Sequence, residues 1–402
     1  MKKFNYLLIC VLAFGCSRFS EDINMTPLPD SFSELDTELP IVNIRVKQKK
    51  FDKMFEQYEE EIEIDAEFDL YRNQVLVVDD EDVELEIKGN YSTRYTLKSI
   101  GVKFEDKYNN TDRSLINPEK VLPFHKVDKI KAIRLRNSGN DFPKTMLKDL
   151  SYTQLAINAE LDLDLTYGEP ALVYINEEFY GLMNIRTEAN TNGMASLYGV
   201  DKDDITLAKV TTHVLYKKDG DEQRIDDFVS ATERRDLNYI KSEIEIDNFI
   251  DYMVFQSYTG NTDWPHNNCR FYAIGNAPFR FVLFDLDNVA NLKINKLPIT
   301  LIEGKRVPNI ITDLFFVLYE DITFKDAFWN RFKFLVERGT VSPDQLQNIV
   351  YKNASAIESE IKFQIQEHSS PRSFIEWELE LDKLLVLFEE RAEMVRLDLE
   401  NR

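Results

Sequence analysis

The stretch "GNTDWPHNNCRFYAIGNAPFRFVLFDLDNVA", residues 260–290, carries the clearest chemical pattern in this chain. It places Asp263 five residues before Asn268 in a polar loop, and an apolar run then ends at Asp285, with Asp287 two residues later. Carboxylate and amide oxygens are the ligands that Mg²⁺ prefers, and the ion needs few of them when phosphate and water complete its shell. We therefore expect the loop and the strand end to face one point.

Such a helix–loop–strand arrangement predicts phosphoryl transfer. Asp263 is the candidate catalytic residue, which orients or deprotonates an acceptor hydroxyl, while Asn268 and Asp285 hold Mg²⁺ on the phosphates and Asp287 assists. Two other interpretations stay open. Asp263 and Asn268 could simply cap a turn, or Asp285 and Asp287 could bind Ca²⁺ instead.

A phosphate site also needs cations, and residues 86–104 offer them. A strand there runs into the small polar turn that contains Arg94, and a second strand carries Lys98. Backbone amides in such a turn can approach phosphate, and lysine or arginine can pair with it. Arg94 and Lys98 are the predicted nucleotide-binding residues, although an exposed lysine on a hairpin is the more common situation.

Composition limits the class of protein. The chain has 402 residues, of which 43% are hydrophobic and 30% charged, as expected for a globular protein with a large core. Its net charge of −22 predicts a surface that repels nucleic acid. The four histidines are scattered, and after a leader is removed Cys269 is the only internal cysteine, which argues against a zinc site.

The first residues resemble a secretory leader. Residues 1–15 combine two lysines with a short apolar run, and cleavage after Gly15 would leave Cys16 at the new terminus for lipidation. The alternative is ordinary leader cleavage without a lipid. Residues 16–40 are polar with three prolines and are predicted to be a tether. We thus expect an exported protein of the bacterial envelope, attached to the membrane through a lipid at Cys16, with no spanning segment in the mature chain.

The order of predicted elements is strands first, hairpins between and helices last. This order predicts an α+β fold with a strand-rich N-terminal lobe and a helical C-terminal lobe. Strands are expected from residue 41 and near 75–88, 94–105, 131–137, 270–274 and 280–285, with a hairpin over 170–186. Helices are expected over 51–61, 143–161 and 244–259, and throughout 308–402.

Four segments, taken in order, resemble the spore coat protein H (CotH) kinase family. They are "IKGNYSTRYTLKS" (87–99), "IRLRNSGNDFPKTMLKDLSYTQLA" (133–156), "PALVYINEEFYGLMNIR" (170–186) and the loop and strand of residues 260–290. The resemblance covers roughly residues 40–290, with the motifs in 86–290, and implies one kinase-like domain over 41–402.

The resemblance implies an atypical protein-kinase-like fold that transfers the γ-phosphate of ATP to serine or threonine of secreted proteins. By position, Asp263 resembles the catalytic aspartate, Asn268 and Asp285 the metal ligands, and Lys98 the phosphate-contacting cation. ATP and Mg²⁺ are the implied cofactors, and the protein acceptor is unknown.

Several positions depart from the family pattern. Thr187 stands where relatives tend to have glutamate, and Glu188 would point the other way if the strand continued through it. Arg134, Arg136 and Asp141 could be site residues or could only hold the fold together. The rival interpretation is therefore a catalytically inactive, kinase-fold surface lipoprotein that acts in binding or envelope assembly. A polysaccharide-associated lipoprotein is a third possibility.

Overall fold

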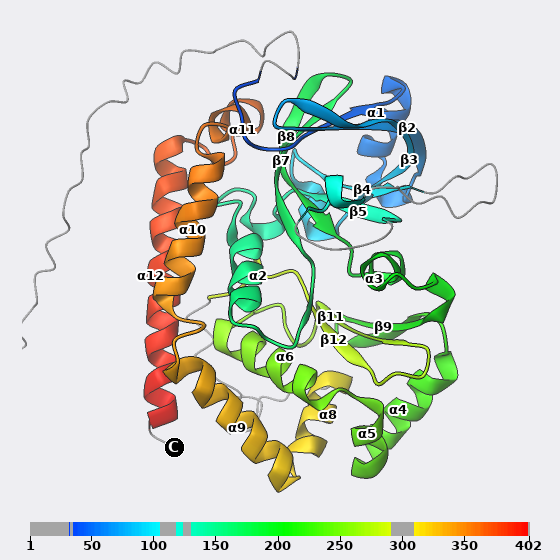
Figure 1. The fold of residues 1–402 in the computed structure, drawn as a ribbon, viewed down its shortest axis with the longest axis vertical. Coiled ribbons are helices and arrows are strands. Elements are labelled where there is room, and N and C mark those ends of the chain that lie inside the picture. Colours follow the sequence, from blue (N-terminus) through cyan, green and yellow to red (C-terminus); the bar gives the residue numbers. More distant parts are fainter. Residues whose placement is uncertain (1–31, 33–34, 105–117, 124–129, 291–308, 401–402) are drawn as a thin grey trace, which may run out of the picture.

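The computed structural model describes residues 32, 35–104, 118–123, 130–290 and 309–400. Strands dominate the first half of this region and helices dominate its end, so the α+β prediction is confirmed (Figure 1). The predicted leader (1–15), the lipidation site Cys16 and most of the tether lie outside the described residues.

The strands at the front close into a seven-stranded barrel, which the sequence patterns did not predict. Its strand order is β1-β2-β3-β4-β5-β8-β7, and β7 pairs in parallel with β1 to complete the ring. Closure leaves the sheet without a free edge. The strands are β1 (Ile41–Arg45), β2 (Ile64–Arg72), β3 (Val75–Lys88), β4 (Ser99–Lys103), β5 (Ala132–Arg136), β7 (Gly168–Ile175) and β8 (Glu178–Thr187).

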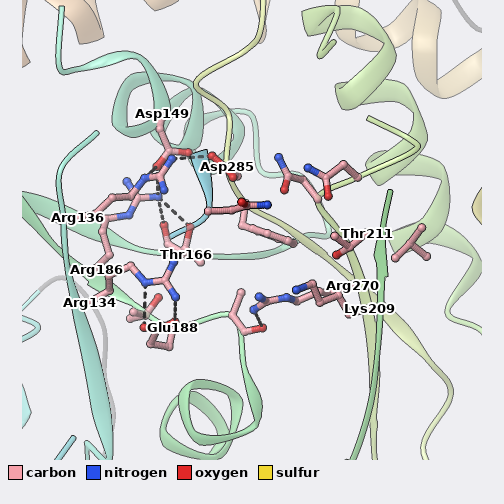
Figure 2. A pocket seen from close by; sticks show the side chains of 17 residues that line it. Arg134, Arg136, Asp149, Thr166, Arg186, Glu188, Lys209, Thr211, Arg270 and Asp285 are labelled. Carbon is pink, nitrogen blue, oxygen red and sulfur yellow. Dashed lines mark hydrogen bonds and ion pairs between the residues drawn. The ribbon is translucent and has the colours of Figure 1, made fainter. Parts of the chain in front are cut away.

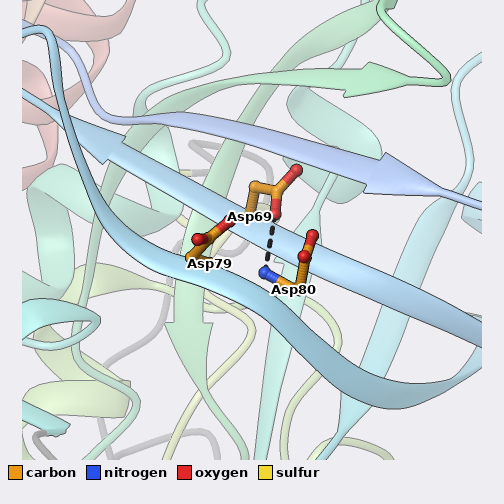
Figure 3. Close-up of side chains that lie close together, drawn as sticks. All are labelled: Asp69, Asp79 and Asp80. Carbon is orange, nitrogen blue, oxygen red and sulfur yellow. Dashed lines mark hydrogen bonds between the residues drawn. The ribbon is translucent and has the colours of Figure 1, made fainter.

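An acidic cluster marks a break in the pairing of β2 with β3. The register shifts after Phe68, and Asp80 adopts a positive φ of 51°. The carboxylate of Asp69 accepts a hydrogen bond from the Asp80 backbone N–H at 3.0 Å and is paired with Arg45 (Figure 3). The cluster of Asp69, Asp79 and Asp80 is thus explained as the support of a β-bulge.

A second sheet of five strands lies below the barrel in Figure 1 and has the order β10-β9-β11-β12-β6. The hairpin of β9 and β10 was not predicted. Strand β9 pairs with β11 at six positions, and β10 pairs with the other edge of β9. The hairpin therefore extends the sheet that contains the strands of residues 260–290. The strands are β6 (Asp164–Leu165), β9 (Ile205–Thr211), β10 (Val214–Asp219), β11 (Cys269–Ile274) and β12 (Arg280–Leu283).

Helices cover the second sheet and form a long stack beside it (Figure 1). In the described part of the chain no helix has the length and hydrophobicity of a membrane span. The helices are α1 (Gln48–Glu56), α2 (Lys148–Asn158), α3 (Thr191–Tyr198), α4 (Glu222–Arg234), α5 (Leu237–Glu243), α6 (Ile246–Thr259), α8 (Ile310–Tyr319), α9 (Ile322–Glu337), α10 (Pro343–Ile357), α11 (Ile361–His368) and α12 (Phe374–Glu400).

Arg391 links α12 to α6, the helix that precedes residues 260–290. Its guanidinium is fully buried and donates to the backbone carbonyls of Ser257 (2.6 Å) and Tyr258 (3.0 Å) in the last turn of α6. A cation there satisfies carbonyl groups that a helix end leaves free and matches the helix dipole. Gly260 then ends α6 in the left-handed conformation, with a φ of 63°.

The predicted strand over 94–105 is shorter in the structure, because a 3₁₀ turn at Tyr91–Arg94 precedes β4. The Thr93 hydroxyl donates to the carbonyl of Asn90 at 2.6 Å, and the Lys98 ammonium donates to the carbonyl of Thr93. These contacts stabilise a turn where the alternation of polar and apolar residues alone predicts a strand.

Replacement of Asn309 tests how the helices hold the opening motif. Its side-chain oxygen caps α8 by accepting from Ile311 (2.9 Å) and Thr312 (3.1 Å), and its amide donates to the carbonyl of Pro265 at 2.9 Å. Asn309→Ala is expected to lower the free energy of unfolding by about 1–2 kcal/mol. Asn309→Ser keeps the cap and should lose less, as measured by urea denaturation. Equal losses would show that the cap contributes nothing.

His368 should make stability depend on pH. It ends α11, where Nε2 lies 2.7 Å from the carbonyl of Tyr180 and Nδ1 lies 3.1 Å from the Thr96 hydroxyl, so Nε2 donates. Burial lowers the pKa of His368, so its contribution is present above the unfolded value of about 6.5 and is lost as pH falls through the folded pKa.

His368→Gln should therefore reduce the difference between the unfolding temperatures at pH 7.5 and at pH 5. The matched control is His213→Gln, at an exposed position, which should leave that difference unchanged. A pH dependence that persists in the His368 variant would assign it to other groups.

Candidate functional site

One cavity collects side chains from the barrel and from the second sheet (Figure 2). Its volume of about 150 Å³ suits phosphate groups and is below the roughly 300–1,000 Å³ of pockets for drug-sized ligands. Five lining side chains are basic and three are carboxylates, so positive charge is in excess. The lining residues are Asn90, Arg134, Arg136, Asp149, Thr166, Arg186, Thr187, Glu188, Ala189, Lys209, Val210, Thr211, Asn267, Asn268, Arg270, Phe284 and Asp285.

On the barrel side, Arg134 and Glu188 form a two-pronged ion pair. Nε and Nη2 of Arg134 donate to the two carboxylate oxygens of Glu188 at 2.9 and 2.8 Å. Although burial opposes it, the Arg134 guanidinium holds the pKa of Glu188 below its ordinary value. Strand β8 ends at Thr187, so the alternation stops there and Glu188 lines the cavity. Glu188 would have pointed away from the cavity only if the strand had continued through it, and the strand does not.

Next to this pair, Arg136 is surrounded by three carboxylates. Its guanidinium lies 2.6 Å from Asp285, 3.1 Å from Asp287 and 3.4 Å from Asp149. Although burial opposes it, these carboxylates raise the pKa of Arg136, with Asp285 the strongest. Asp149 also pairs with Arg186 at 3.0 Å. Arg136 therefore both lines the cavity and holds the fold together, which combines the two interpretations left open by its sequence.

Asp141 has a different place. Its carboxylate accepts from the backbone N–H of Lys148 at 3.0 Å and from the hydroxyl of Thr145. These contacts delay the start of α2 to Lys148, so the predicted helix over 143–161 is shortened at its N-terminus. Asp141 is thus a structural residue outside the cavity lining.

On the side of the second sheet, the wall includes Lys209, Thr211 and Arg270 (Figure 2). Phe284 also lines the cavity. Arg270 donates to the carbonyl of Ala189, and its guanidinium lies 4.7 Å from the centre of the Phe284 ring. Burial and the positive charge of Arg134 lower the pKa of Arg270 to about 10. This wall thus holds positive charge that the nearby carboxylates only partly offset.

The structure brings together two of the predicted metal ligands. Asn268 and Asp285 both line the cavity, and each has a positive φ, of 54° and 60°. Non-glycine residues in this conformation often occur at functional sites, where the surroundings hold them in place. The Asp285 side chain is 27% exposed and Arg136 bonds its Oδ1, so its other oxygen can face a ligand.

Asp263 lies in the same loop as Asn268 but is not part of the cavity lining. Its Oδ2 accepts from the side-chain amide of Asn288 at 2.7 Å, and its backbone N–H donates to Asn261 at 3.1 Å. The indole of Trp264 donates to the Tyr252 hydroxyl at 3.1 Å, which anchors the loop. The loop therefore holds Asp263 in one orientation.

Three other predicted residues are not brought into the cavity. The ammonium of Lys98 is buried against the rings of Phe55 (4.6 Å) and Tyr58 (4.7 Å), and this burial lowers its pKa. Arg94 is exposed and stacks on its neighbour Tyr91.

Asp287 is 3% exposed, and its carboxylate accepts from the backbone N–H of Asn140 at 2.8 Å. Burial and the neighbouring charge of Asp285 raise its pKa well above the ordinary range. These positions do not support contact of Lys98 or Arg94 with phosphate, or contact of Asp287 with metal.

Sequence reasoning missed three cations of the cavity: Arg186, Lys209 and Arg270. Arg186 stands at the end of a quoted motif and Arg270 directly follows Cys269, so proximity to the motifs was an available signal for both. Lys209 offered no such signal, because it enters the cavity only through the unpredicted pairing of β9 with β11.

Comparison with known protein families gives a match over the region that contains the cavity. The family model described as CotH kinase protein matches residues 85–395, which include all the residues that line the cavity. No curated protein matches the chain.

Removal of Asp149 should destabilise the whole cavity, because Arg136 and Arg186 would lose a shared buried partner. Asp149→Ala is expected to lower the free energy of unfolding by about 3–5 kcal/mol in urea denaturation. Asp344→Ala is the matched control, since Asp344 occupies the first turn of α10 as Asp149 does in α2, but is exposed. Its expected loss is about 0.3–1 kcal/mol. Similar losses in both variants would refute the structural role of Asp149.

Proposed function

The chain belongs to the CotH kinase family, and we propose that it transfers the γ-phosphate of ATP to serine or threonine hydroxyls of a protein acceptor. The observation that carries this proposal is one basic cavity that contains Asn268 and Asp285 together with the Arg134–Glu188 pair. In this interpretation the barrel is the front lobe of a kinase-like fold, and the second sheet with its helices is the rear lobe. The phosphates of ATP enter the cavity between them.

The Arg134–Glu188 pair supports the nucleotide part of the proposal. Protein kinases hold the phosphates with a lysine that a glutamate keeps in place. Here a guanidinium fixed at 2.8 and 2.9 Å by a buried carboxylate offers the same combination of charge and rigidity. Arg270 and Lys209 supply further positive charge to the phosphates. These residues take the role that the sequence motif assigned to Lys98.

The donor set also fits a magnesium ion. Asn268 and Asp285 would hold it, and two protein ligands suffice because Mg²⁺ keeps several water and phosphate ligands. When bound, Mg²⁺ supplies positive charge that neutralises the phosphate oxygens during transfer.

Asp263 is the proposed orienting group and base for the acceptor. The hydroxyl oxygen of the acceptor forms a bond to the γ-phosphorus while the bond to the β,γ-bridging oxygen breaks, so ADP leaves. The hydroxyl proton passes to the carboxylate of Asp263. Asn288 supports this role, because its hydrogen bond of 2.7 Å fixes the direction of that carboxylate.

A second candidate function is an inactive kinase-fold surface lipoprotein that acts in binding or envelope assembly. Two observations favour it: Asp285 is already paired with Arg136, and Asp263 lies outside the cavity lining. Export through residues 1–15 and a lipid anchor at Cys16 are compatible with both candidates, and we propose the bacterial envelope as the location for either.

Calorimetric titration with ATP, with and without Mg²⁺, tests the proposal. Micromolar binding that requires Mg²⁺ is expected, and Asp285→Asn should weaken binding about ten-fold or more, since a metal ligand loses its charge. Asp326→Ala, at an exposed position on α9, is the matched control and should bind as the unmodified protein does. The unfolding temperature of each variant shows whether it is folded.

Asp263→Asn separates binding from transfer in the same experiment. Its affinity for ATP with Mg²⁺ should stay within about two-fold, while phosphoryl transfer falls at least about 100-fold, the usual contribution of a general base. Unchanged transfer would remove Asp263 from the proposed mechanism. Absence of ATP binding by the folded protein would favour the inactive surface protein.

A further inference from the structure

The turn between β9 and β10 is built from residues that fit its backbone poorly. Thr212 and His213 form its two-residue loop, and both have a positive φ, of 48° and 69°. This is the pattern of a type I′ turn, which favours asparagine, aspartate and glycine. A side chain that is branched at Cβ is crowded at positive φ. Because Thr212 is branched in this way, the turn is strained.

Two other hairpins in the described part of the chain use the same turn with better-suited residues. Asn73 and Gln74 join β2 to β3, and all four residues of the two turns have a positive φ. Asn176 and Glu177 join β7 to β8. Asparagine at the first position of both turns tolerates the left-handed conformation well. The strain at Thr212 is thus particular to the β9–β10 turn, and such strain is a reason to look for a function there.

The strained turn contacts the loop that carries the proposed magnesium ligand. The backbone N–H of His213 donates to the carbonyl of His266 at 2.8 Å. The two imidazole rings stack, with their centroids 5.3 Å apart and their planes inclined by 29°. A backbone hydrogen bond and a ring contact therefore join two segments that lie more than fifty residues apart in the chain.

The contact lies beside the cavity in both segments. Thr211, two residues before His213, lines the cavity (Figure 2), and so do Asn267 and Asn268, the two residues after His266. Two residues of extended chain span at most about 7 Å. Fixing the carbonyl of His266 therefore restricts where Asn268 can lie.

Other contacts hold the first half of the loop. The side-chain amide of Asn309 donates to the carbonyl of Pro265 at 2.9 Å, and that of Asn288 donates to Asp263 at 2.7 Å. These bonds act on the end of the loop that carries Asp263, whereas the contact with the β9–β10 turn acts on the end that carries Asn268. Loss of the turn contact should therefore affect the metal ligand more than the proposed base.

We propose that His213 and His266 are positioning residues, which clamp residues 261–268 to the β9–β10 turn and so hold Asn268 where it binds Mg²⁺. Both rings act through the backbone of the loop, in the way that supporting residues keep the ligands of a site in a productive geometry. The role in Mg²⁺ binding rests on the proposed function, whereas the clamp itself does not.

The double variant Thr212→Asn/His213→Gly separates this role from a merely structural one. Asn-Gly is the preferred type I′ sequence and keeps the backbone N–H that bonds His266, so the unfolding temperature should stay the same or rise. The ring contact is lost, however. Hydrogen exchange of residues 261–268, followed by mass spectrometry, should therefore become about two- to ten-fold faster.

Calorimetric titration with ATP at several Mg²⁺ concentrations gives the second measurement. In the double variant, the Mg²⁺ concentration for half-maximal ATP binding should rise about two- to ten-fold, because a loop that is open part of the time binds the ion only in the remaining fraction. ATP affinity without Mg²⁺ should stay within about two-fold, since the basic side chains of the cavity are unchanged.

Three further variants serve as tests of the ring contact. His266→Ala should reproduce both effects without altering the turn, and His266→Phe, which keeps a ring to stack on His213, should restore most of the loss. The matched control is Glu177→Gly, which creates the same Asn-Gly sequence in the exposed β7–β8 turn and should change neither measurement.

Unchanged exchange of residues 261–268 in both the double variant and His266→Ala would overturn the clamp, whether or not the protein binds ATP. Faster exchange with an unchanged Mg²⁺ requirement would overturn the positioning role, as would an equal loss of ATP affinity with and without Mg²⁺. If the unmodified protein binds no ATP with Mg²⁺, the proposed function fails, and hydrogen exchange alone decides whether the clamp exists.

Discussion

The buried charge cluster around Arg136 is the interaction on which the rest of the structure depends. A guanidinium from barrel strand β5 meets Asp149 of α2 and both carboxylates, Asp285 and Asp287, of the segment after β12. A buried ion without partners is very unfavourable, so none of these elements can move away alone. The backbone N–H of Leu286 also donates to Asp149 at 2.7 Å, which links the end of the 260–290 segment to α2.

The cluster has a chemical consequence, because one of its members faces the cavity. Asp285 is held by Arg136 on one oxygen while its side chain stays partly exposed. The cations that line the cavity outnumber its carboxylates, and burial together with neighbouring positive charges lowers the pKa of Arg270 and Lys209. A negatively charged group in the cavity would relieve this repulsion, which is the electrostatic basis of the proposed phosphate site. The cavity combines rigidity from the cluster with an excess of basic side chains.

The success of sequence reasoning differed between residues for physical reasons. Asn268 and Asp285 could be predicted to lie near one cavity, because a loop and a strand end seventeen residues apart in the chain belong to one local unit. Lys98 could not be placed, because its direction depends on aromatic side chains of Phe55 and Tyr58 far earlier in the chain. For Glu188, the sequence did not decide whether the side chain points into the cavity or away from it. Because β8 ends at Thr187, the side chain lines the cavity.

By itself, the sequence determined the α+β class, most of the elements and the ordered motifs of the family, since turn residues and periodic apolar positions act over short distances. Only the tertiary structure decided that the front strands close into a barrel, because closure requires β1 to pair with β7, more than a hundred residues later. The same holds for the basic wall, where Lys209 meets Arg270 only through the pairing of β9 with β11. Pairing between distant strands depends on the packing of the whole chain, and local patterns do not contain that information.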